Sequence, residues 1–172
     1  MEFSRPLQMH YRPRKGWMND PNGLVYFQGY YHVFYQHAPD FEIPWREPFH
    51  WTAIVKDETL YLFYASIYTP EGADQIKQTV SVAYSTDGIH FEKYANNPVI
   101  ACYPAEGGPD FRDPAVACVD GRFYCVMATG NPEKRVARLL LYESENLFDW
   151  QYSCILSEWK EAKFAECPSF MQ

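Results

Sequence analysis

The sequence predicts an all-β protein, and three observations carry this prediction. Short runs of alternating aromatic and β-branched residues recur along the chain, helical periodicity is nearly absent, and aromatic residues make up 18% of the 172 residues. Turn-forming residues separate the runs, as expected for strands joined by tight hairpins. A chain of this length is expected to form one domain with a substantial core.

One strand–turn–strand pattern occurs three times, and each copy is expected to form a β-hairpin. Every copy contains a short strand, a polar turn and a longer apolar strand. The copies span residues 24–35, 53–64 and 115–126.

A second hairpin is expected after the second and third copies. It begins with residues 80–88 in one case and with residues 138–146 in the other. Two hairpins per repeat give a four-stranded antiparallel sheet, and such sheets in succession are typical of the blades of a β-propeller. The fold class predicted here is therefore all-β, with roughly two to three blades of four-stranded antiparallel sheets.

The spacing of the copies predicts that the first repeat is incomplete. The turn residues Asp57 and Asp120 are 63 positions apart, whereas Gln28 and Asp57 are only 29 apart. Residues 37–51 leave no room for a second hairpin, so about half a blade is expected to be missing there. With its end at Gln172, the chain is expected to encode roughly two and a half blades, whereas closed propellers contain ~4–8.

Composition excludes several classes of function. The chain has 15 Lys and Arg against 22 Asp and Glu, a net charge of −7, so a nucleic-acid or anionic-membrane partner is not expected. The histidines show no metal-ligand spacing, and we expect no metal or other cofactor. No signal peptide or membrane span is visible, so we expect a soluble cytoplasmic protein. Its 5 cysteines, without a CxxC pair, are expected to be reduced and to pack as small core hydrophobes.

Three acidic residues near prolines are candidates for catalytic groups. Asp20 lies in WMNDPNG, Asp113 in FRDP and Glu166 in AECP, each ahead of an expected strand. Taken alone, Asp20 fits a turn, Asp113 a structural pair with its arginine, and Glu166 a surface acid. Taken together, at matching points of a repeat, they are expected to face one common axis. Paired acids at a common point are the groups that cleave glycosidic bonds.

With these three motifs in this order, the chain resembles family 32 of the glycoside hydrolases, the group of invertases, inulinases, levanases and sucrose-6-phosphate hydrolases. WMNDPNG, FRDP and EC correspond to the signature motifs of that family. The resemblance implies a partial five-bladed β-propeller with the active site at one end of its axis. Residues 1–172 would form the N-terminal portion of that propeller, without the C-terminal β-sandwich that usually follows.

The resemblance also implies an activity and a role for each acid. The reaction would be retaining hydrolysis of β-fructofuranosyl bonds in sucrose or fructans through a fructosyl-enzyme intermediate. Asp20 would be the nucleophile, Glu166 the general acid and then the general base, and Asp113 the acid that holds the fructose hydroxyls in the transition state. A retaining mechanism needs the nucleophile and the acid ~5–5.5 Å apart. The residues expected to bind substrate are Asn19, Gln36, Trp45 and Arg112.

The chain also departs from the family pattern, and the departures leave alternatives open. His50 and Trp51 run directly into the next strand, without the expected Ser-Gly-Ser-type motif, and Ser169 replaces an aspartate beside the third motif. One alternative is an inactive truncated remnant with a carbohydrate-binding or structural role. Another is an inverting glycosidase that acts on arabinose or xylose, against which WMNDPNG and the EC motif argue. Whether the chain is an active hydrolase or a remnant, two or more copies are expected to associate and cover the exposed blade edges.

Overall fold

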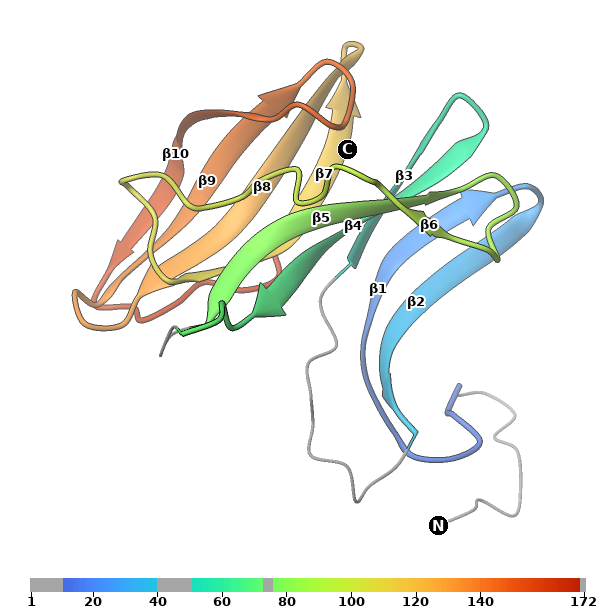
Figure 1. Ribbon diagram of the computed structural model, residues 1–172, viewed down its shortest axis with the longest axis horizontal. Coiled ribbons are helices and arrows are strands. Elements are labelled where there is room, and N and C mark those ends of the chain that lie inside the picture. Colours follow the sequence, from blue (N-terminus) through green and yellow to red (C-terminus); the bar gives the residue numbers. More distant parts are fainter. Residues whose placement is uncertain (1–10, 40–50, 73–75, 171–172) are drawn as a thin grey trace.

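The computed structural model describes residues 11–39, 51–72 and 76–170, and every regular element within them is a β-strand (Figure 1). The prediction of an all-β fold is confirmed. The strands are β1 (Trp17–Phe27), β2 (Tyr30–Ala38), β3 (Trp51–Lys56), β4 (Thr59–Tyr68), β5 (Lys77–Ser85), β6 (Glu92–Lys93), β7 (Asp110–Val119), β8 (Arg122–Asn131), β9 (Val136–Ser144) and β10 (Gln151–Lys160).

The strands form three antiparallel sheets, in which neighbours in the chain are also neighbours in the sheet. Strands β3 to β6 form one four-stranded sheet and β7 to β10 form another, while β1 and β2 pair as a two-stranded sheet. Strand β3 contacts both β1 and β7, so the first strands of the three sheets lie together. Figure 1 shows this arrangement, with the blue β1–β2 sheet beside the green sheet and the orange sheet beyond it. The described residues therefore form the predicted two and a half blades.

The three predicted hairpins are present, and they share one kind of turn. Both residues of each turn have positive φ, between 48° and 85°. This backbone is a type I′ turn, whose twist matches that of the flanking strands. The turn residues are Gln28–Gly29, Asp57–Glu58 and Asp120–Gly121. Glycine takes the second position in two of the turns without steric cost, whereas Glu58 takes it with a side chain, at φ 57°.

The link between the third and fourth strands of a blade also repeats. In the second blade the hydroxyl of Ser85 accepts hydrogen bonds from the N–H groups of Asp87 and Gly88, at 3.2 and 2.9 Å. In the third blade Ser144 accepts the same two bonds from Asn146 and its successor, at 3.2 and 3.0 Å. These turns are the structural counterpart of the second sequence repeat.

The core fills the space between the second and third blades. Its fully buried side chains come from both sheets and include Phe63 and Val82 on one side and Met127 on the other. Phe63 also meets Trp150 edge to face, with ring centroids 5.7 Å apart. This packing fixes the third blade, which carries Asp113, against its neighbour.

None of the five cysteines forms a disulfide, and only Cys125 is a buried core residue. Burial raises the pKa of its thiol far above the ordinary value. The expectation that all the cysteines pack in the core was wrong, because Cys118 stands near the exposed end of β7 and Cys154 on the outer strand β10. Among the residues with described positions, no helix has the length and apolarity that a membrane crossing requires.

The turn after β3 offers a test of this backbone geometry. Replacing Glu58 by glycine should raise the free energy of unfolding by about 0.5 kcal/mol, because glycine removes the strain of a left-handed residue but makes the unfolded chain more flexible. The reverse change at the matching position, Gly121→Glu, should lower it by about 1 kcal/mol, since nothing lies within 4 Å of the added Cβ and only backbone strain is introduced. Urea denaturation measures both; equal signs would contradict the assignment of one shared turn.

Candidate active site

The two aspartates of the predicted site lie inside strands rather than ahead of them. Asp20 is within β1 and Asp113 is within β7, and at both places the pairing with the neighbouring strand shifts register. A β-bulge of this kind lets a strand continue through a proline, which cannot donate a hydrogen bond to the ladder. In β1, the side chain of Asn22 donates a hydrogen bond of 3.0 Å to the carbonyl oxygen of Asp20 and supports the bulge.

The three acidic motifs share an unusual backbone conformation. Asp20, Asp113 and Cys167 have φ values of 29°, 56° and 50°, and each precedes a proline. Positive φ is disfavoured for residues other than glycine, and such strain is concentrated at functional sites. The third motif therefore matches the other two at Cys167, not at Glu166. The expectation of matching points holds for the two aspartates, whereas Glu166 stands one residue earlier.

The three motifs converge on one cavity of about 220 Å³. Pro21, Pro114 and Pro168, each from one motif, all line it. Residues 51–53 of β3 complete the wall, so the first strands of all three sheets contribute. The repeat thus brings the motifs to a shared centre.

Asp113 connects the third blade to the segment that carries Glu166. Its side chain is buried, with 7% of its surface exposed, and its Oδ2 accepts a hydrogen bond of 2.9 Å from the backbone N–H of Cys167. A backbone donor with a fixed direction holds this carboxylate in one orientation.

The acids of all three motifs influence the thiol of Cys167. Its pKa is raised to about 11, first by desolvation and then by the negative charges of Asp113, Asp20 and Glu166, in that order. The electrostatic environment of this thiol therefore depends on all three motifs.

Arg112 lies between two carboxylates. Its Nη2 is 2.9 Å from Oε1 of Glu166, and its Nη1 is 2.9 Å from Oδ1 of Asp110. We predicted Arg112 as a substrate-binding residue, and the described contacts are with these two acids. Asp110 was missed in the sequence, although a signal was present. Residues two apart on a strand face the same side, so an Asp-Phe-Arg sequence at the start of β7 places the two charges together.

The two predicted amide side chains, Asn19 and Gln36, are hydrogen-bonded to each other. Asn19 and Gln36 are cross-strand partners in β1 and β2, and Nδ2 of Asn19 donates a hydrogen bond of 3.3 Å to Oε1 of Gln36. Gln36 is buried. Trp45, the remaining predicted substrate contact, lies outside the described residues.

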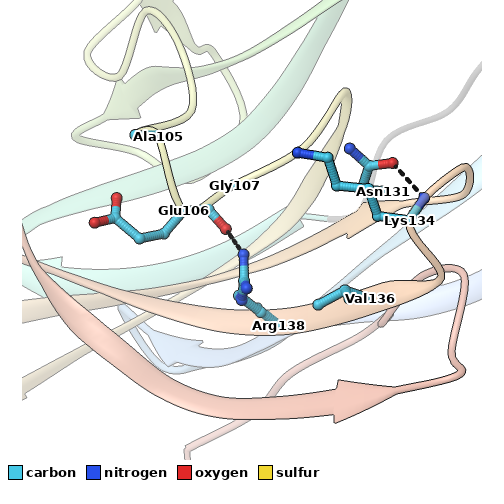
Figure 2. Close-up of a pocket in the computed structure, with 7 residues that line it drawn as sticks. All are labelled: Ala105, Glu106, Gly107, Asn131, Lys134, Val136 and Arg138. Atoms are coloured by element: carbon cyan, nitrogen blue, oxygen red, sulfur yellow. Dashed lines mark hydrogen bonds between the residues drawn. The ribbon is translucent and has the colours of Figure 1, made fainter.

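A second cavity, of about 360 Å³, lies at the loop before β7 and contains none of the predicted site residues (Figure 2). Its lining residues are Ala105, Glu106, Gly107, Asn131, Lys134, Val136 and Arg138. The guanidinium of Arg138 donates a hydrogen bond to the carbonyl oxygen of Glu106 and forms an ion pair of 2.7 Å with Glu158. These contacts fix the loop that leads into β7. Within the described part of the chain, no group of three His, Cys, Asp or Glu side chains is arranged to hold a metal ion.

Comparisons with known proteins place the chain in a family. The family model for the glycosyl hydrolases family 32 N-terminal domain matches residues 10–55 and 49–172. The chain is 35% identical to the levanase of Bacillus subtilis over 88% of its length, and 31% identical to a sucrose-6-phosphate hydrolase of Escherichia coli over 94%. Among solved structures, a family 32 β-fructofuranosidase of Bombyx mori covers 93% of the chain with a TM-score of 0.79 and 31% identity. A variant of the same enzyme was solved in complex with sucrose.

The comparisons also locate the break in the first repeat. The two matched segments of the family model overlap at residues 49–55, at the end of residues 37–51, where the sequence predicts the missing half-blade. The alignment with the levanase spans 191 residues, more than the whole of this 172-residue chain, so the relative contains positions without a counterpart here. The chain spans 26% of the levanase, 40% of the sucrose-6-phosphate hydrolase and 40% of the insect enzyme.

The position of Asp110 predicts a pH dependence of stability. Burial raises the pKa of Asp110, Arg112 lowers it, and Glu166 and Asp113 raise it, with a net shift upward from 3.8. In the pH range between 3.8 and the raised value, the folded state binds more protons than the unfolded state, so stability falls as pH rises. The stability of the wild type relative to Asp110→Asn should therefore decrease through this range and then become constant. Urea denaturation from about pH 3 to about pH 7 measures it; an increase would contradict the assignment.

Proposed function

The chain belongs to glycosyl hydrolase family 32, and from this membership we propose that it is a retaining glycoside hydrolase that cleaves β-fructofuranosyl bonds of sucrose or fructans. Its curated relatives include a levanase and sucrose-6-phosphate hydrolases, which are glycoside hydrolases. The observation that carries the proposal is the meeting of the three acidic motifs. Pro21, Pro114 and Pro168 line one cavity, and Asp113 accepts a hydrogen bond from the backbone N–H of Cys167, the residue after Glu166.

The proposed reaction has two steps. A carboxylate oxygen of Asp20 attacks the anomeric carbon of the fructosyl unit while Glu166 gives its proton to the leaving glycosidic oxygen, so a fructosyl-enzyme ester forms and the aglycone leaves. Glu166 then takes a proton from a water molecule, whose oxygen attacks the same carbon and releases Asp20. Two displacements at one carbon retain its configuration. Asp20 is exposed and directly precedes Pro21, which lines the cavity shared by the three motifs, and this position supports its role as nucleophile.

The remaining residues would hold the sugar. Asp113, oriented by the Cys167 N–H at 2.9 Å, would accept hydrogen bonds from fructose hydroxyls, which strengthen as the ring becomes oxocarbenium-like. Asn19 and Gln36 already orient one another, so their remaining donors and acceptors are positioned for hydroxyl groups. We propose Trp45 and Arg112 as further contacts of the substrate.

The setting of the protein belongs to the same proposal. We propose that residues 1–172 are the N-terminal portion of a family 32 propeller, that the protein is cytoplasmic, and that copies of the chain associate at blade edges. Strand β10 is the outer strand of its sheet and exposes 38% of Ile155, 50% of Leu156 and 44% of Trp159. Exposed apolar side chains along an outer strand favour association.

Catalysis is tested by release of fructose from sucrose, inulin and levan. Asp20→Asn and Glu166→Gln should each lower kcat/KM by at least about 100-fold, because each removes a reacting group. Glu145→Gln, which removes the same charge from an exposed turn of the third blade, should leave activity unchanged. Carbon-13 NMR of the anomeric carbon of the first fructose released should show the β-anomer. If the wild type releases no more fructose than Glu166→Gln, the chain is instead a carbohydrate-binding remnant. The two-stranded first sheet, which is half the size of the other two, supports this alternative.

Association is tested by sedimentation velocity over a range of concentrations. The wild type should sediment as a dimer or larger species, and Leu156→Lys should shift it toward the monomer, because a charge on an apolar interface is costly to bury. Leu24→Lys, a change at an exposed leucine of β1, is the matched control. A monodisperse monomer for the wild type at all concentrations would disprove association.

A further inference from the structure

Among the described residues, the guanidinium of Arg112 contacts both Glu166 and a second acid, Asp110. Arg112 uses two different terminal nitrogens, one for Glu166 and one for Asp110, each at 2.9 Å. Exposure of the side chains decreases along this line, from 51% for Glu166 to 31% for Arg112 and 15% for Asp110. The line runs from the open side of the site into the protein.

We propose that Asp110 is a positioning residue for the reaction, which holds the guanidinium of Arg112 against Glu166 and offsets its positive charge. This inference rests on the proposed function, because it concerns Glu166 as the proton donor. Asp110 itself is not expected to contact the substrate.

The reason lies in the opposing needs of a general acid. A cation at hydrogen-bond distance favours the ionised form of a carboxyl group, whereas a general acid has to hold its proton until the glycosidic bond breaks. Asp110 lies as close to Arg112 as Glu166 does, so the guanidinium can orient Glu166 while its charge is shared with a second carboxylate. Within the described part of the chain, the other ionisable groups that influence Asp110 or the Cys167 thiol are Asp20 on β1 and Asp113 on β7, and neither is a cation.

A purely structural role does not account for Asp110. Within the described residues its Oδ2 is buried and has no hydrogen-bond partner, and burial is the largest cause that raises its pKa. A buried carboxylate oxygen without a partner destabilises the fold. A neutral residue would fill the same space without this penalty, so the charge itself has a function.

The backbone around Asp110 is rigid enough for a positioning role. Gly108, two residues earlier, donates a hydrogen bond of 2.9 Å to Oγ1 of Thr129, and a Cβ at this glycine would lie 2.1 Å from the carbonyl oxygen of Gly130. Asp110 pairs directly with Gly130 in the sheet. The bond from Arg138 to the Glu106 carbonyl, drawn in Figure 2, fixes the loop one step further back.

The test follows the proton on Glu166 directly. The side-chain carboxyl of Glu166 is titrated by carbon-13 NMR in the full chain, with Glu166→Gln to assign its signal. In Asp110→Asn the midpoint should fall by about one pH unit, or tenfold in the proton-binding constant, because Arg112 loses the charge that offsets its own. Glu143→Gln is the matched control, because it removes an equal charge from an ion pair with Arg122 in the same sheet. This pair lies near the turn Asp120–Gly121, at the end of the sheet opposite Asp110, so the midpoint should not change.

An unchanged or higher midpoint in Asp110→Asn would overturn the proposal. A second variant keeps the test decisive if Asp110→Asn does not fold: in Arg112→Gln the midpoint should rise above that of the wild type, and a fall or no change would likewise overturn it. The descending limb of the pH profile of fructose release should move with the midpoint in Asp110→Asn. An absence of turnover in the wild type would reject the proposed function but not the positioning role of Asp110, because the NMR titration of Glu166 needs no turnover.

Discussion

The proline that follows each acidic motif is the constraint on which the arrangement of the site depends. A proline cannot donate to the strand ladder, so β1 and β7 continue past it only through a bulge. The residue before the proline then takes a positive φ, as seen at Asp20, Asp113 and Cys167. These strained residues directly precede Pro21, Pro114 and Pro168, which line one cavity.

Electrostatics determines how these acids can coexist. Several carboxylates around one point repel one another, and within the described residues Arg112 is the cation that contacts two of them. A hydrogen bond stabilises Asp113, whose carboxylate accepts it from the backbone N–H of Cys167. The cost is visible in the raised pKa values of Asp110 and Cys167, for which desolvation is the largest cause and neighbouring carboxylates act in the same direction, opposed at Asp110 by Arg112. The acidic cluster is therefore a local cost to stability, whereas the apolar packing between the second and third blades stabilises the fold.

Much of the fold could be predicted because its signals are local. The hairpins follow from alternation and from the residues of their type I′ turns, and the incomplete first repeat follows from the spacing of Gln28 and Asp57. Two expectations were less accurate. The acids were placed ahead of strands, because an Asp–Pro step suggests a turn and a bulge leaves no separate signal. Cysteines such as Cys154 were assigned to the core, because sequence does not reveal which strand lies at the edge of a sheet.

The sequence by itself determined the all-β repeat and the identity of Asp20, Asp113 and Glu166 as the acids of interest, because hydrophobic alternation and short motifs are written in consecutive residues. Only the tertiary structure decided how they are connected. Arg112 and Glu166 are 54 residues apart, as are Asp113 and Cys167, and their contacts exist only because the chain returns past β10 to the start of β7. The burial of Asp110 was decided in the same way, because it depends on packing between distant segments, whereas its pairing with Arg112 follows from their positions two apart on β7.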